Sequence, residues 1–425
     1  MSIPILWQDP FSFEQKKSLL ISKYFLSLGE DEKFILKGFG INTEFPKTLF
    51  DYARFLKVLD LSNLKSNSGA ILYKLDLHIL DDEINLELPY SLGQHKQFFS
   101  RLQNLTLNLM LFSTENATYL LSILEKNATK ISALKLNKFH SEYEPKLIQA
   151  LIRIIKSQEQ LRQFSIVGKH YPEEFYGIIL ALESQKNSLQ EVIIEYCNCS
   201  TEFEVLKNCK NLEILRMRYP ELLNTLNCKI NTLEIVDFQI DAPYIFQILE
   251  NSGLLLQRLK FNSESTLEEP LLLEALKFFC PNITYLNISF IEFSTQLLEL
   301  IDNLQNLQFF TLGCTCHTPA KKEHKMLARQ FAEILPSTLQ YLDLRGSWLK
   351  PYMNLFLNNC NAPLKKLLIY ELDKKITELI IKFCIRNRTL KYVGLFEHWF
   401  LDDNIRNEME TYVTLVLHES IVVDL

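Results

Sequence analysis

The hexapeptide L-x-x-L-x-L recurs along almost the whole chain and constrains the fold more than any other feature. Its clearest copy is formed by Leu339, Leu342 and Leu344. In a short strand, the last two of these side chains point to one side, and the residues between and beside them point to the other. Each copy therefore has one apolar row and one outward row. A series of such copies buries its apolar rows by stacking one copy on the next.

The other copies keep the three apolar positions, and several steps between their first residues are about 26 to 30 residues. Leucine-rich repeats have periods of roughly 20–29 residues. The copies begin at Leu56, Leu72, Leu102, Ile131, Leu161, Leu189, Leu212, Ile230, Leu256, Ile283, Leu307, Leu364 and Leu390. The Asn or Cys of the full consensus is present only as Cys197, so the repeats are degenerate.

From Leu102 onward, most copies are followed by apolar residues at i, i+3 and i+4, the pattern of a helix buried on one side. The predicted helices cover residues 118–126, 144–156, 173–185, 243–250, 270–279, 295–303, 324–335 and 374–386. A strand followed by a helix at this period predicts an α/β leucine-rich-repeat solenoid. We expect a horseshoe of the ribonuclease-inhibitor-like kind, with parallel strands on the concave face and helices on the convex face.

The repeats also predict three parts of the chain. Residues 1–55 do not carry the repeat and are expected to form an N-terminal cap with a short helix, because a solenoid end otherwise exposes its core. Residues 56–412 are expected to form the solenoid. Residues 413–425, with apolar stretches at 414–417 and 421–423, are expected to supply a closing strand at the edge of the sheet.

Composition limits the compartment and the partners. The 425 residues carry a formal net charge of −6 and are 47% hydrophobic, which suffices for a continuous core and gives no reason to expect a nucleic-acid partner. The start lacks the pattern of a secretory signal, and no run reaches the roughly 18 apolar residues of a membrane helix. The nine dispersed cysteines fit a reduced compartment. We expect a cytoplasmic or nuclear protein without a membrane partner.

Catalytic and metal-binding patterns are weak. Cys314, Cys316, His317 and His324 form the cluster that most resembles a metal site, because thiolate and imidazole bind zinc. Structural zinc sites usually have two well-separated ligand pairs, so we expect no metal and no cofactor. The sequence has no glycine-rich phosphate loop, nucleophile elbow or H-E-x-x-H motif. We therefore expect no catalytic residues and no enzyme activity; a metal-dependent enzyme around Cys314 is the weakest hypothesis.

Binding residues are expected in the outward rows, on strands about 4.8 Å apart. Aromatic residues occupy these rows near the C-terminal end, and Tyr and Arg dominate binding hot spots. The predicted protein-binding residues are Tyr285, Phe309, Tyr341, Asp343, Arg345, Tyr370, Tyr392 and Phe396. We expect Tyr341 and Tyr392 to tolerate Ala with little loss of stability. The alternative is that aromatic residues simply favour strands, or that a neighbouring loop covers Tyr285 and Phe309.

The segment I-P-I-L-W-Q-D-P-F, from Ile3 to Phe11, resembles the segment that follows the F-box in the fungal family of F-box proteins with leucine-rich-repeat tails. The Asn-, Lys- and Phe-rich repeats are similar to that family too, so the resemblance spans nearly the full length. In that family the F-box docks the Skp adaptor of a cullin ubiquitin ligase, and the repeats hold the substrate. The resemblance thus implies the substrate-recognition part of an SCF-type ubiquitin ligase receptor, a substrate adaptor in protein catabolism.

The F-box itself is expected before Ile3, where the sequence holds only Met1 and Ser2. We therefore expect binding to the Skp adaptor only if an F-box is encoded upstream of Met1. The alternative is a stand-alone leucine-rich-repeat protein that scaffolds or inhibits a partner without any link to ubiquitin. In both hypotheses the target is a protein held on the concave face.

Overall fold

The computed structural model describes residues 58–60, 73–78, 99–108, 114–139, 145–169, 177–198, 201–221, 229–238, 242–263, 269–315, 321–347, 349–396 and 403–423. The predicted N-terminal cap, residues 1–55, lies outside these residues. The chain has two compact units, Met1–Leu212 and Glu213–Leu425, called unit 1 and unit 2 below. Whether residues 56–412 form a single solenoid stays a prediction.

Unit 1 contains parallel strands that pair in sequence order, from β1 to β6. Helices, including short 3-10 helices, connect the later strands. The elements are β1 (Val58–Asp60), β2 (Lys74–His78), β3 (Asn104–Asn108), α5 (Thr114–Asn127), β4 (Ala133–Phe139), α6 (Pro145–Lys156), β5 (Gln163–Gly168), α7 (Ile178–Ala181), η5 (Leu182–Gln185), β6 (Glu191–Asn198) and η6 (Thr201–Asn208).

Unit 2 repeats the same order of strand and helix, with parallel strands from β7 to β15. Its strands are β7 (Ile214–Glu221), β8 (Thr232–Phe238), β9 (Arg258–Ser263), β10 (Tyr285–Glu292), β11 (Phe309–Thr315), β12 (Tyr341–Asp343), β13 (Lys366–Ile369), β14 (Tyr392–Leu395) and β15 (Thr414–Leu417). Its helices are α8 (Ala242–Ser252), α9 (Glu269–Phe279), α10 (Thr295–Asn303), α11 (Lys321–Ile334), η7 (Lys350–Tyr352), α12 (Met353–Asn359), α13 (Lys374–Asn387), α14 (Asp403–Glu410) and η8 (His418–Ser420).

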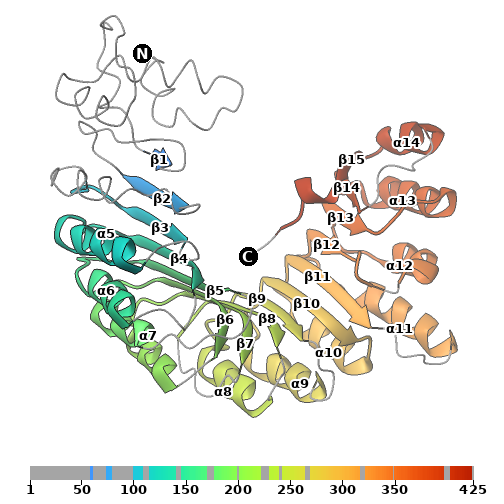
Figure 1. Ribbon diagram of the computed structural model, residues 1–425. Coiled ribbons are helices and arrows are strands. Elements are labelled where there is room, and N and C mark those ends of the chain that lie inside the picture. Colours follow the sequence, from blue (N-terminus) through green and yellow to red (C-terminus); the bar gives the residue numbers. More distant parts are fainter. Residues whose placement is uncertain are drawn as a thin grey trace, which may run out of the picture. The chain divides into compact units, whose positions relative to one another are not determined.

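The helices of each unit lie on one side of its strands (Figure 1). The opposite side is called the strand face below. Parallel strands joined through helices at the period of the repeat make each unit an α/β leucine-rich-repeat solenoid, and this fold class is confirmed. Among the described residues, no helix has the length and apolar character needed to span a membrane.

The register of the strands explains the repeat. In unit 2 the middle position of the hexapeptide pairs across neighbouring strands, so that Leu259, Leu286, Phe310 and Leu342 form one ladder. All four side chains are buried. The ladder buries apolar area in every repeat, and each buried Leu or Phe side chain stabilises the fold by about 1.5–3 kcal/mol. The spacing of the leucines therefore serves contacts between repeats.

Most predicted helices are present in the structure. One of them is shorter than predicted, and two further α-helices were not predicted. Helix α6 buries Leu147, Leu151 and Ile155 on one side, as the i, i+4 spacing predicts. The helix expected over 173–185 contains only α7 and η5 among the described residues, because residues 170–176 lie outside them. Helices α12 and α14 were not predicted. They have 7 and 8 residues, too few for the helical period to stand out.

Two buried glutamines hold main-chain groups of unit 1 together. The Ile131 N–H donates to Gln158 Oε1 at 2.9 Å, and Gln158 Nε2 donates to the Ile154 carbonyl at 2.7 Å. One repeat later, Gln185 accepts from the Leu161 N–H at 3.1 Å and donates to the Gln158 carbonyl at 3.0 Å. Each amide thereby accepts from the first residue of its own repeat, and Gln185 also donates to a carbonyl of the preceding repeat. Such main-chain groups are expensive to bury unpaired.

Replacing Gln158 by Leu is expected to lower the free energy of unfolding of unit 1 by about 2 kcal/mol, because it leaves the buried Ile131 N–H and Ile154 carbonyl without this partner. Chemical denaturation followed by circular dichroism measures the loss, and hydrogen exchange should locate it at the Ile131 amide. Gln160→Leu is the matched control, because Gln160 is exposed two residues away. Equal stability of the two variants contradicts the role given to Gln158.

Candidate functional site

The predicted binding residues lie on the strand face of unit 2 in two adjacent rows. The first row crosses the strands in register, where Tyr285 pairs with Phe309, Phe309 with Tyr341, and Lys366 with both Tyr341 and Tyr392. The second row follows the ends of β12, β13 and β14. It holds Arg345, Tyr370 and Phe396. The repeat register thus brings together residues that are far apart in the sequence.

The chain's own C-terminal segment covers part of the first row. Tyr285 and Tyr341 are each only 1% exposed. The Tyr285 hydroxyl donates to the Val423 carbonyl at 3.1 Å, and the Val423 N–H donates to the Tyr341 hydroxyl at 3.4 Å. Tyr341 also packs with Ile421 in an apolar cluster against which Phe309 lies. The expectation that Tyr285 and Tyr341 face an open wall is therefore wrong, because residues 421–423 lie over them.

This cover also changes two other expectations. Residues 421–423 were expected to extend the closing strand, but the last strand, β15, ends at Leu417 and the chain then turns through η8 onto the strand face. Truncating Tyr341 to Ala removes a buried ring, so little loss of stability is no longer expected for that residue; losses of about 3–5 kcal/mol are typical for buried aromatic rings. Tyr392 remains exposed.

Burial and charge keep the Tyr341 hydroxyl neutral. Burial is the main reason that the pKa of Tyr341 lies far above its usual range, and the negative charge of Asp343 raises it further. Asp343 is itself buried and is held by Arg345, whose Nη2 lies 2.7 Å from Asp343 Oδ2 and whose Nε lies 3.0 Å from Oδ1. This two-point contact fixes the guanidinium at the edge of the strand face. Asp343 was expected to face the open wall. It is buried instead, and it orients Arg345.

The second row presents aromatic surface. The Tyr370 and Phe396 rings stack with centroids 5.4 Å apart and an angle of 17° between their planes. They are 46% and 47% exposed, and the His418 ring lies 5.1 Å from the Phe396 ring. We call Tyr370 and Phe396 the exposed aromatic pair. Such a pre-ordered pair is suited to a protein contact, because its rings lose little rotamer freedom on binding.

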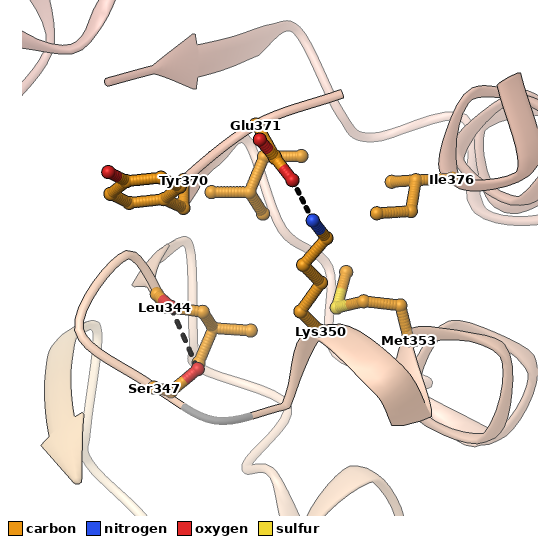
Figure 2. A pocket seen from close by; sticks show the side chains of 8 residues that line it. Leu344, Ser347, Lys350, Met353, Tyr370, Glu371 and Ile376 are labelled. Atoms are coloured by element: carbon orange, nitrogen blue, oxygen red, sulfur yellow. Dashed lines mark hydrogen bonds and ion pairs between the residues drawn. The ribbon is translucent and has the colours of Figure 1, made fainter. Parts of the chain in front are cut away.

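A small pocket lies beside the exposed aromatic pair. Figure 2 shows Lys350 and Glu371 facing each other in an ion pair, with Met353 and Ile376 next to them and Tyr370 at the other side. The pocket has a volume of about 30 Å³. Sites for small organic ligands are roughly 300–1,000 Å³, so this pocket fits no such ligand. The exposed rings and not the pocket are the feature suited to recognition.

A charged group occupies the first strands of the same unit. The Glu234 carboxylate is 1% exposed and lies 2.8 Å from Arg218, 3.3 Å from Lys260 and 4.0 Å from Arg216. A buried carboxylate is stable only with such partners. These three cations therefore compensate the buried charge of Glu234.

The strand face of unit 1 is hollowed. A depression of about 380 Å³ lies over β2 to β6, and its polar lining includes Lys74, Lys135, Gln163 and Glu191. Gln163 and Glu191 are bonded to each other at 3.1 Å. Among the described residues that line it, the aromatic one is Phe164, whose side chain is buried, so this surface is the less suited of the two to a hot spot.

The residues considered for a metal site are only partly described. Cys314 is partly buried, and burial, with the Glu269 charge second, raises the pKa of its thiol far above the usual range. A protonated thiol is a poor metal ligand. Cys316 and His317 lie outside the described residues, and the described residues contain no group of three His, Cys, Asp or Glu placed to bind a metal ion. The expected absence of a metal stays a prediction.

Four other cysteines are buried free thiols, as their place near helix ends predicts; they are Cys209, Cys280, Cys360 and Cys384. Burial raises the pKa of Cys209 to about 11 and that of Cys280 to about 12. Such thiols stay protonated and unreactive near neutral pH.

Two features of the site were not found from the sequence. His418 was not singled out, because a lone histidine after a strand carries no pattern. Gly394 was also missed, although a glycine in an apolar strand often marks the close approach of another segment. A Cβ at Gly394 would lie 2.9 Å from Ile421 Cδ1. The absent side chain thus leaves room for the C-terminal segment.

Comparison with known proteins gives no family. No family model matches the chain, and no curated protein matches its sequence. The resemblance to fungal F-box proteins therefore stays a hypothesis.

The chain is similar to several solved structures, each at 14% identity. A chain of the yeast Rad7 and Elc1 complex matches over 99% of this chain and 93% of its own, with a TM-score of 0.45. An internalin from Listeria monocytogenes matches over 75% and 81%, with a TM-score of 0.33. The complex of TLR13 with ssRNA13 matches over 88% and 62%, with a TM-score of 0.41. The fold assignment rests on the chain's own repeats.

Proposed function

We propose that this chain is a protein-binding scaffold whose main contact surface is the exposed aromatic pair of unit 2, with Arg345 and Tyr392 on the same strand face. The observation that carries the proposal is the stack of Tyr370 on Phe396, in which two large rings are nearly half exposed and yet ordered. Rings in that state bring large apolar area to an interface at a small entropic cost. No catalysis is part of the proposal.

The charge arrangement supports the same surface. Arg345 is held by Asp343 with its guanidinium directed by two hydrogen bonds. A guanidinium that is fixed before binding loses less freedom when it meets a carboxylate or a carbonyl of a partner. An aromatic pair beside a fixed arginine is the kind of surface that forms the centre of protein interfaces.

We further propose that the scaffold serves as the substrate-recognition part of an SCF-type ubiquitin ligase receptor. This second proposal rests on the resemblance of residues 3–11 and of the repeats to the F-box family. The alternative is an interaction or inhibitor protein without a ubiquitin link. An F-box encoded upstream of Met1 supports the first, and binding of the Skp adaptor to that longer form tests it. Its absence from the gene favours the second.

The binding site is tested with two double variants. Tyr370→Ala with Phe396→Ala is expected to weaken binding of a captured and purified partner by about 2 kcal/mol or more, which is roughly 30-fold in Kd. The matched control is Tyr119→Ala with Phe278→Ala, which removes one Tyr and one Phe that are exposed on helices α5 and α9. Isothermal titration calorimetry measures both. The site belongs elsewhere if the helix variant loses binding and the strand-face variant retains it.

A further inference from the structure

Residues 421–423 lie on the strand face of unit 2 without joining its sheet. The N–H groups of Ile421 and Val422 both donate to the His418 carbonyl, within the turn of η8. Val422 is 38% exposed. The segment is therefore held by side chains that rise from the strands, and its main chain takes part in no strand ladder.

Two tyrosines hold the main chain of a single residue. Tyr285 on β10 donates to the Val423 carbonyl, and Tyr341 on β12 accepts from the Val423 N–H. Phe309 on β11 lies between them, with ring centroids 6.5 Å from Tyr285 and 6.2 Å from Tyr341. Contacts of this kind hold the main chain of a segment and do not involve the side chain at that position.

Two residues earlier, the segment is held by a side chain. Ile421 packs on Tyr341 and Leu368, and the missing side chain of Gly394 makes its place, because a Cβ there would lie 2.9 Å from Ile421 Cδ1 and 3.0 Å from Leu368 Cγ. Ile421 closes the turn of η8, with φ −130° and ψ −2°. Val423 follows two residues later and packs against the same cluster.

We propose that the groove formed by Tyr285, Phe309, Tyr341, Leu368 and Gly394 is a binding site for a short segment of a partner protein. That segment carries a branched aliphatic residue two positions before the residue whose main chain the tyrosines hold. Residues 421–423 occupy the groove as an internal copy of this ligand, and the partner segment replaces them. The inference rests on the proposed protein-binding function and names the chemistry of the partner, whereas its test needs no captured protein.

The test uses the full chain and a fluorescent peptide of residues 418–425. In one variant, Ile421→Gly, Val422→Gly and Val423→Gly empty the groove while the chain keeps its length. Fluorescence anisotropy should show saturable binding of the peptide to this glycine variant and at least tenfold weaker binding to the unchanged chain, whose own segment competes. The Ile421→Asp peptide should bind neither protein.

Further variants separate the groove from unspecific contact. Adding Tyr285→Phe and Tyr341→Phe to the glycine variant should weaken peptide binding at least tenfold, and adding Gly394→Val should abolish it. Tyr119→Phe, on helix α5, is the control that should change nothing. If the triple variant does not unfold cooperatively, and so is not properly folded, the single Ile421→Gly variant replaces it.

Two results overturn the inference. A cooperatively folded glycine variant that binds no peptide, or binds the Ile421→Asp peptide equally well, makes residues 421–423 a structural contact only. A concentration-dependent dimer of the unchanged chain in analytical ultracentrifugation, lost in the glycine variant, assigns the groove to the segment of a second copy. Both results leave the exposed aromatic pair untouched, so the failure of this inference is distinct from the failure of the proposed function.

Discussion

Replacing Leu286 by Asp is expected to lower the free energy of unfolding of unit 2 by about 4 kcal/mol or more. Leu286 is fully buried in the ladder between Leu259 and Phe310. A carboxylate at that place has no partner, and burying an unpaired charge is among the most destabilising changes a single substitution makes. The loss is measured by chemical denaturation.

The distribution of the damage is as informative as its size. In a repeat protein each repeat contacts mainly its neighbours, so hydrogen exchange should show protection lost first in β9, β10 and β11 and kept in unit 1. Asn287→Asp is the matched control, since Asn287 is the next residue and is partly exposed on the strand face. Uniform loss over both units, or no loss, is incompatible with stacked repeats.

The stability of unit 2 is expected to fall by about 3 kcal/mol as the pH rises from about 4.5 to about 7 because of Glu269 alone. Burial raises the pKa of Glu269 from 4.5 to about 7, although the Glu292 N–H donates to its Oε1 at 2.8 Å. In the unfolded chain the carboxyl loses its proton near pH 4.5, whereas the folded chain retains it to about pH 7. Each unit of pKa difference corresponds to 1.36 kcal/mol, so this contribution to stability is present below pH 4.5 and lost above pH 7.

Glu269→Gln isolates this effect, because the amide oxygen still accepts from the Glu292 N–H and carries no charge. Above pH 7 the variant is expected to be more stable than the unchanged chain, and the difference should shrink towards pH 4. Thermal unfolding across this range measures the difference. Glu274→Gln, at an exposed position of the same helix, should leave the pH profile unchanged. A constant difference at all pH values contradicts the raised pKa.

Local patterns predicted most of the fold, because the buried positions of each repeat recur at a fixed spacing in the sequence. The spacing of Leu339, Leu342 and Leu344 determines both the strand and the buried row, and the same spacing is enough to align Tyr285, Phe309 and Tyr341 in one row. Helix α6 followed from its i, i+4 apolar residues. The glutamines were not predicted, because Gln158 follows helix α6 and Gln185 ends η5, places where polar residues normally face solvent.

The covering of the site was beyond local patterns for a different reason. Tyr285 and Val423 are separated by 138 residues and Tyr341 and Val423 by 82. An apolar stretch such as residues 421–423 has no period that distinguishes a strand from a segment lying across strands. The exposure of Tyr370 and Phe396, by contrast, follows from their place just after the strands, beyond the reach of that segment.

The contact of Gly394 with Ile421 makes two positions far apart in the sequence depend on each other. A Cβ at 394 would lie 2.9 Å from Ile421 Cδ1 and 3.0 Å from Leu368 Cγ, so a larger residue there requires both neighbours to shift. Position 423 is under two constraints. Its side chain packs against the same cluster, which favours an apolar residue, and the tyrosines hold its main chain, which excludes proline because proline has no N–H.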